Sequence, residues 1–182
     1  MMDLVHRVAT RYVSSQVSLP VPLIRQTTNF SCGAAALLGV LRYWLEEDLG
    51  VQDESDLWGK LDVSEENGTE PDRIVAVARK FGLQAAYVTK MTERDLREAL
   101  ARGDTVIMLI QAWRDAPVDW AVDWDDGHYV VAVGIDNTNV YLMDPSTSGT
   151  YAWMSLDELP DRWHDFDENG TPQYGLAIVV RG

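Results

Sequence analysis

Residues 26–44 read QTTNFSCGAAALLGVLRYW, and the change of character within this stretch indicates how the chain folds. A polar loop gives way at Cys32 to apolar side chains spaced three and four residues apart, which predicts an α-helix to about Glu47. The only cysteine in the sequence is therefore expected at the start of a helix. Gly33 and the alanines that follow it are small, so this helix start can approach a neighbouring sheet closely.

Size and composition favour one globular domain over residues 1–182, with residues 1–19 as an N-terminal extension or helix. The 29 acidic and 15 basic residues give a net charge of −14, which argues against a nucleic-acid or anionic-membrane partner. The longest apolar run, Ala34 to Leu41, is shorter than the ~18 residues of a membrane span. The N-terminus lacks the features of a signal peptide, and one cysteine excludes an internal disulfide and a thiolate-rich zinc site. We expect a cytoplasmic protein that uses no metal and no cofactor.

The order of the predicted elements indicates an α+β fold. After the first helix, a second is expected over Glu70 to Phe81, and a third follows the capping residue Thr92 and stops at Gly103. The later half of the chain is rich in strands and hairpin turns. Strands are predicted over residues 104–113, 128–135, 140–144, 151–154 and 174–180. Helices early and antiparallel strands late are typical of the α+β class.

The position of Cys32 raises the question of a reactive thiol. The amides and dipole at a helix N-terminus favour the thiolate, which is the nucleophilic form of cysteine. A lone cysteine is more often a small buried apolar residue, so the position alone does not decide. Acyl transfer also needs a base, a group that orients the base, and hydrogen-bond donors for the oxyanion.

Three other residues supply candidates for these parts. His128 begins one apolar strand and Asp144 ends the next, so the two lie diagonally across a hairpin if Val130 is opposite Asp144. A slip by one residue would place them on opposite faces of the sheet. Gln26, in the loop before Cys32, can donate its side-chain amide to an oxyanion beside the Cys32 backbone amide.

These residues carry a resemblance to a known family. Gln26, the run Cys32-Gly33-Ala34-Ala35, the run from Gly127 to Val131 and the pair Asp144-Pro145 resemble the papain-like cysteine peptidases that process bacteriocin precursors. Those enzymes are the double-glycine leader peptidases, and the likeness extends over roughly Pro20 to Val180. It implies a papain-like fold, in which an early helix bearing the thiol packs on a late antiparallel sheet bearing His and Asp.

The resemblance also implies residue roles. Cys32 would be the nucleophile, His128 the general base and then acid, Asp144 the group that orients His128, and Gln26 the oxyanion donor. The reaction would be hydrolysis of a leader or other extended peptide through a thioester, by a stand-alone member without the transporter. Four residues are expected to bind substrate: Gly33, Gly127, Trp124 and Asp126.

Two alternatives remain open, a papain-like acyltransferase of the transglutaminase type and a peptide-binding module that has lost turnover. The acidic, Trp-rich loop 114–127 is a candidate substrate rim for basic side chains, with Trp113 expected to pin the loop to the body. Residues 165–170 have the spacing that opens a calcium loop, but Leu176 stands where its final glutamate is required. We therefore expect a solvated turn there.

Overall fold

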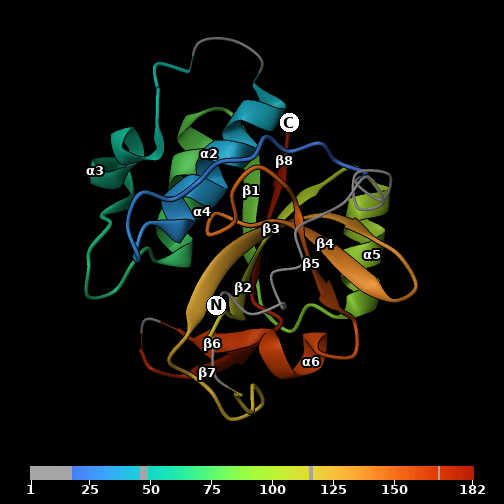
Figure 1. Cartoon of the computed structure of the whole chain (residues 1–182). Coiled ribbons are helices and arrows are strands. Elements are labelled where there is room, and N and C mark those ends of the chain that lie inside the picture. Colours follow the sequence, from blue (N-terminus) through green and yellow to red (C-terminus); the bar gives the residue numbers. More distant parts are fainter. Residues whose placement is uncertain (1–17, 46–48, 115–116, 168) are drawn as a thin grey trace.

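The structure is a computed structural model that describes residues 18–45, 49–114, 117–167 and 169–182 (Figure 1). The expected N-terminal helix, which falls within residues 1–17, lies outside these ranges.

The helices begin and end close to where the apolar spacing predicts. The helix that bears the cysteine begins at Cys32. Another helix is capped by Thr92, whose side chain accepts a hydrogen bond from the Asp95 amide, while the Asp95 carboxylate accepts one from the Thr92 amide. The segment η1–α3 was not predicted, because each of its helices is four residues long and too short to show a period. The helices are α2 (Cys32–Trp44), η1 (Glu54–Leu57), α3 (Trp58–Leu61), α4 (Pro71–Lys80), α5 (Glu93–Ala101) and α6 (Leu159–Arg162). Among these described helices, none has the length and hydrophobicity that a membrane crossing requires.

The strands form one six-stranded sheet and one separate hairpin. Their order in the sheet is β1-β8-β2-β3-β4-β5, and every neighbouring pair is antiparallel. The hairpin pairs β6 with β7. The strands are β1 (Gln84–Val88), β2 (Thr105–Gln111), β3 (Gly127–Ile135), β4 (Asn139–Met143), β5 (Ala152–Ser155), β6 (His164–Phe166), β7 (Pro172–Tyr174) and β8 (Ala177–Arg181).

The sheet stands between two layers of helix, with α2 and α4 on one face and α5 on the other (Figure 1). Strand β2 is buried along its whole length, as its continuous run of apolar residues predicts. The architecture is the expected α+β, papain-like one: an early helix carries the cysteine and packs against a large antiparallel sheet.

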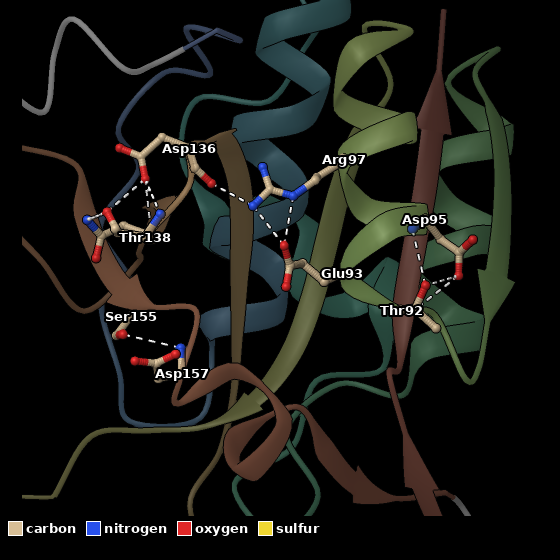
Figure 2. Close-up of polar contacts among 9 residues, drawn as sticks. Thr92, Glu93, Asp95, Arg97, Asp136, Thr138, Ser155 and Asp157 are labelled. Atoms are coloured by element: carbon tan, nitrogen blue, oxygen red, sulfur yellow. Dashed lines mark hydrogen bonds and ion pairs between the residues drawn. The ribbon is translucent and has the colours of Figure 1, made fainter.

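The hairpin of β3 and β4 has the register on which the candidate site depends. Val131 lies opposite Met143, and one further step along both strands places Val130 opposite Asp144. At the other end, the Asp136 carboxylate accepts hydrogen bonds from the amides of Thr138 and Asn139, while Arg97 of α5 donates to the Asp136 carbonyl (Figure 2). The turn and α5 therefore fix the hairpin at the end away from the site.

The β6–β7 hairpin was not predicted as strands, although a turn was expected within it. Its loop is closed by Asp167, whose carboxylate accepts hydrogen bonds from the amides of Asn169 and Thr171 and from the Gln173 side chain. The carboxylate oxygens of Asp167 are therefore hydrogen-bonded within the turn, as in an Asx-turn.

Candidate active site

The loop that leads to Cys32 is anchored by a buried carboxylate from η1. Glu54 is 1% exposed, and its Oε1 accepts hydrogen bonds from the Thr27 amide at 2.8 Å, the Thr27 hydroxyl at 2.7 Å and the Ser31 hydroxyl at 2.9 Å. The indole of Trp58 donates to the other oxygen, Oε2. Because four donors satisfy one buried carboxylate, the approach to Cys32 is held in one conformation.

Gly33 lets the first turn of α2 approach β3. A Cβ atom built at this position would lie 2.8 Å from Thr69 Cβ and 3.1 Å from the Tyr129 ring. The neighbouring Cys32 is 8% exposed, at the surface of the core. A glycine is thus required for the thiol to reach the sheet.

His128, at the start of β3, joins Cys32 to Asp144. Its Nε2 lies 2.7 Å from Asp144 Oδ1, and the two residues are 6% and 1% exposed. The ring is also close enough to the Cys32 side chain to lower the pKa of its thiol. Since Nε2 is taken by Asp144, Nδ1 is the nitrogen left to face the sulfur.

The contacts of His128 shift the pKa of both partners. Burial raises the pKa of the Cys32 thiol, but the hydrogen bond and positive charge of His128 outweigh it, so the pKa is lower than that of an ordinary cysteine. Burial lowers the pKa of His128, but the charge of Asp144 outweighs it and the pKa rises well above the ordinary value. Both shifts favour a thiolate–imidazolium pair.

Asp144 is held as a carboxylate by several donors. The Ser146 amide and hydroxyl each donate to Oδ1 at 2.8 Å, and Trp113 Nε1 donates to Oδ2 at 2.7 Å. Burial would raise the pKa of Asp144, yet the charge and hydrogen bond of His128, together with the Ser146 donors, keep it well below the usual range. The group facing His128 therefore stays charged throughout the neutral pH range.

The contact of Trp113 with Asp144 was missed by the sequence reasoning, which placed Trp113 only as an anchor for its loop. Arg162, which is 3% exposed, lies over the Trp113 ring at 4.9 Å and over the Trp120 ring at 3.9 Å, and pairs with Glu158 at 2.8 Å. Trp113 is 31 residues from Asp144 in sequence, and no spacing rule links an indole in a loop to a carboxylate so far away.

Gln26 lies half-buried beside the Asp144–Pro145 turn. Its backbone amide donates to the Pro145 carbonyl at 3.0 Å, and its side-chain Nε2 donates to the Thr28 carbonyl at 2.7 Å. A glutamine amide has two hydrogens, so one further donor remains on Nε2. Its Oε1 is buried and has no hydrogen-bond partner among the described residues.

A cleft of about 380 Å³ opens at Cys32. Two of the four residues expected to bind substrate, Gly127 and Trp124, line it. Asp126 does not belong to the described lining, and its carboxylate pairs with Arg114 at 2.6 Å. Asp123 is paired with the same arginine at 3.0 Å, so of the loop acids considered as a rim only Asp125 is among the described lining residues.

The fold and the site together define a class. A buried imidazole lies between a carboxylate and a thiol, and the thiol is at the start of an early helix that packs on a late antiparallel sheet. This arrangement is that of a papain-like cysteine peptidase. The model of the Peptidase C39 family matches residues 20–166, and the chain belongs to this family.

The chain is also similar to individual proteins. An uncharacterised protein of Methanothermobacter marburgensis is 30% identical over 128 residues, which cover 68% of this chain and 71% of that protein. Two solved structures, each 18% identical, share the fold. A C39-like peptidase from Bacillus anthracis has a TM-score of 0.64, with 91% of this chain and 96% of that chain covered. A double-glycine motif protease from an AMS/PCAT transporter, in complex with a leader peptide, has a TM-score of 0.56, with 89% and 91% covered.

Proposed function

We propose that this chain hydrolyses a peptide bond with Cys32 as the nucleophile, His128 as base and acid, and Asp144 as the group that orients His128. One observation carries the proposal. The His128 ring bonds to the buried Asp144 carboxylate at 2.7 Å, and the same ring lies near Cys32, where it lowers the pKa of the thiol. A cysteine that only fills space in a core needs no such partner.

In the proposed reaction the Cys32 thiolate attacks the carbonyl carbon of the scissile amide. The negative charge that forms on the carbonyl oxygen is stabilised by the backbone amide of Cys32 and by the free hydrogen on Gln26 Nε2. The His128 imidazolium gives its proton to the leaving amine, the C–N bond breaks, and a thioester remains. Water then attacks the thioester carbonyl while His128 takes one of its protons, the C–S bond breaks, and release of the acid restores the thiolate–imidazolium pair.

The substrate in this proposal is a leader or other extended peptide. Gly127, Thr69 and Tyr129 line the cleft together with Cys32, and a glycine in this lining leaves room for a peptide backbone. The related double-glycine motif protease that binds a leader peptide supports the same class of substrate.

The test begins with the reactivity of the thiol. Because the pKa of Cys32 is lowered, iodoacetamide at pH 6 should alkylate it faster than it alkylates free cysteine, as followed by mass spectrometry. In His128→Gln the thiolate loses its partner and the rate should fall. A wild-type rate no greater than that of free cysteine would favour a binding module without turnover.

Turnover is tested with peptides made by digesting a cell extract with chymotrypsin and then removing that protease. Wild-type protein should create new peptide ends and Cys32→Ala none, with the same melting temperature. Asp144→Asn should give an intermediate rate, because an amide oxygen can still hold the imidazole. Products that carry an added amine in place of water would identify an acyltransferase.

A further inference from the structure

The cleft at Cys32 is acidic on its walls. No lysine or arginine occurs among the described residues that line it. Its carboxylates come from three separate segments, the loop before α4, the loop before β3 and the β6–β7 hairpin. They are Glu65, Glu66, Glu70, Asp125, Asp165 and Asp167.

The arginines of the protein that form ion pairs are engaged elsewhere. Arg114 holds Asp123 and Asp126, and Arg181 holds Asp104 at 2.8 Å. Within the described parts of the chain, five of the six cleft carboxylates take part in no ion pair, namely Glu65, Glu66, Asp125, Asp165 and Asp167. The cleft thus keeps a negative potential that nearby side chains do not cancel.

A second cavity continues the cleft between α4 and the β6–β7 loop. It has a volume of about 230 Å³ and shares Glu70, Pro71 and Asp167 with the cleft. Asp72 and Tyr87 also line it, with Thr89, Asn169 and Gln173. Carboxylates around a tyrosine ring form a favourable environment for an ammonium or guanidinium group.

Two pKa shifts agree with this charge. Burial and the neighbouring charges of Asp167, Asp72 and Glu70 raise the pKa of Tyr87. Burial, with a smaller contribution from Glu70, raises the pKa of Asp165 to about 6. Burial is the larger cause of both shifts, and the neighbouring carboxylates act in the same direction.

Thr69 is a further sign that the cleft receives a polar ligand. It lines the cleft and is 6% exposed, and its buried hydroxyl has no hydrogen-bond partner in the described structure. Its carbonyl accepts a hydrogen bond from the Tyr129 hydroxyl at 2.9 Å, which fixes the residue in place. A buried hydroxyl in the lining that Cys32 shares can be satisfied by a peptide group of a bound substrate.

From the acidic cleft, its side cavity and Thr69 we infer that the peptides cut at Cys32 carry a lysine or arginine close to the scissile bond. The basic side chain enters the cavity of Glu70, Asp72 and Tyr87, while the peptide backbone passes Thr69 and Cys32. This inference rests on the proposed function and adds the chemical class of its substrate.

The experiment uses the chymotryptic peptide library, which leaves lysine and arginine inside its peptides. Mass spectrometry identifies the new ends, and the residues on both sides of each cut are compared with the library. Lysine and arginine together should be enriched about tenfold at one position near the cut, with aspartate and glutamate depleted. Because the attraction is electrostatic, the enrichment should decrease in high salt.

A charge variant and a matched control test the location. In Glu70→Gln/Asp72→Asn the enrichment should disappear. The control Glu98→Gln/Asp157→Asn removes the same number of charges at exposed sites outside the described lining of the cleft. This variant should keep the enrichment of lysine and arginine. Equal cleavage of basic and neutral sequences by wild type would overturn the inference and leave the peptidase proposal intact. If the wild type cuts no peptide and Cys32 alkylates no faster than free cysteine, the proposed function itself fails.

Discussion

Trp113 is the side chain that connects the candidate active site to the rest of the protein. Its indole N–H donates to Asp144 Oδ2, the oxygen that His128 does not use. Its ring face lies under the buried guanidinium of Arg162. Trp113 does not touch the reacting atoms, so it is a positioning residue that holds the carboxylate in line with the imidazole.

Trp113→Phe keeps a ring under Arg162 and removes the hydrogen bond to Asp144. We expect kcat to fall about tenfold, in line with the loss of a hydrogen bond to a charged group, with KM little changed. Without the hydrogen bond from Trp113, the negative charge of Asp144 acts more strongly on His128 and raises the pKa of its imidazolium. The alkaline limb of the pH–rate profile should therefore move to higher pH.

Trp120→Phe is the control, because Trp120 also packs under Arg162 at 3.9 Å but its indole donates no hydrogen bond to Asp144 in the described structure. It should leave the pH profile in place. If the pH–rate profile of Trp113→Phe matches that of the wild type and only the melting temperature falls, Trp113 stabilises its loop and does not position Asp144.

The sequence was informative about His128 and Asp144 and silent about Trp113, for a physical reason. Alternation along two strands of one hairpin places His128 and Asp144 together once the register is known. Trp113 reaches Asp144 from the loop after β2, and loop conformation depends on contacts such as the Arg114 ion pairs, which leave no period in the sequence.

At the scale of elements, the contact of the α2 start with β3 decides where the sulfur lies. Gly33 lies in this contact, and a Cβ atom at its position would meet both Thr69 and the Tyr129 ring. The apolar spacing and small residues of this segment predicted the helix and its approach to a sheet. The β6–β7 hairpin escaped prediction because strands of three residues are too short for alternation to be recognised.

Gly33→Ala should displace the first turn of α2 and reduce peptide cleavage strongly. The added methyl group would overlap Thr69, and overpacking of this kind costs about 1–3 kcal/mol of the free energy of unfolding. Gly59→Ala is the control, because a Cβ at this position in α3 meets nothing within 4 Å. It should keep the activity and stabilise the protein by up to about 1 kcal/mol. Equal activity of the two variants would show that the position of α2 tolerates a larger residue.

At the scale of the whole molecule, the concentration of acid at the cleft affects stability. Asp165 has a pKa raised to about 6, chiefly by burial, whereas the unfolded chain has the ordinary lower value. The folded state therefore binds this proton more tightly, so Asp165 lowers the stability as the pH rises from about 4 through 6.

Asp165→Asn removes that penalty and keeps an oxygen for the hydrogen bond from the Phe166 amide. We expect the variant to unfold with a free energy about 1 kcal/mol higher than wild type at pH 7. The difference should shrink as the pH falls from about 6 through 3.8 and vanish only at about pH 2.5, where the carboxyl is protonated in both states. Urea unfolding at the two pH values measures it, and a gain of the same size at both would assign the effect to packing.

The place of β8 in the sheet has a consequence for biosynthesis. Residues 177–181 lie between β1 and β2, although they follow β2 by more than sixty positions in the chain. A ribosome must therefore release this late segment before β1 can join the other strands, and pairing of such distant segments is slow. Throughout that interval the sheet stays split, and chaperones can meet its open edges before the mature cleft exists.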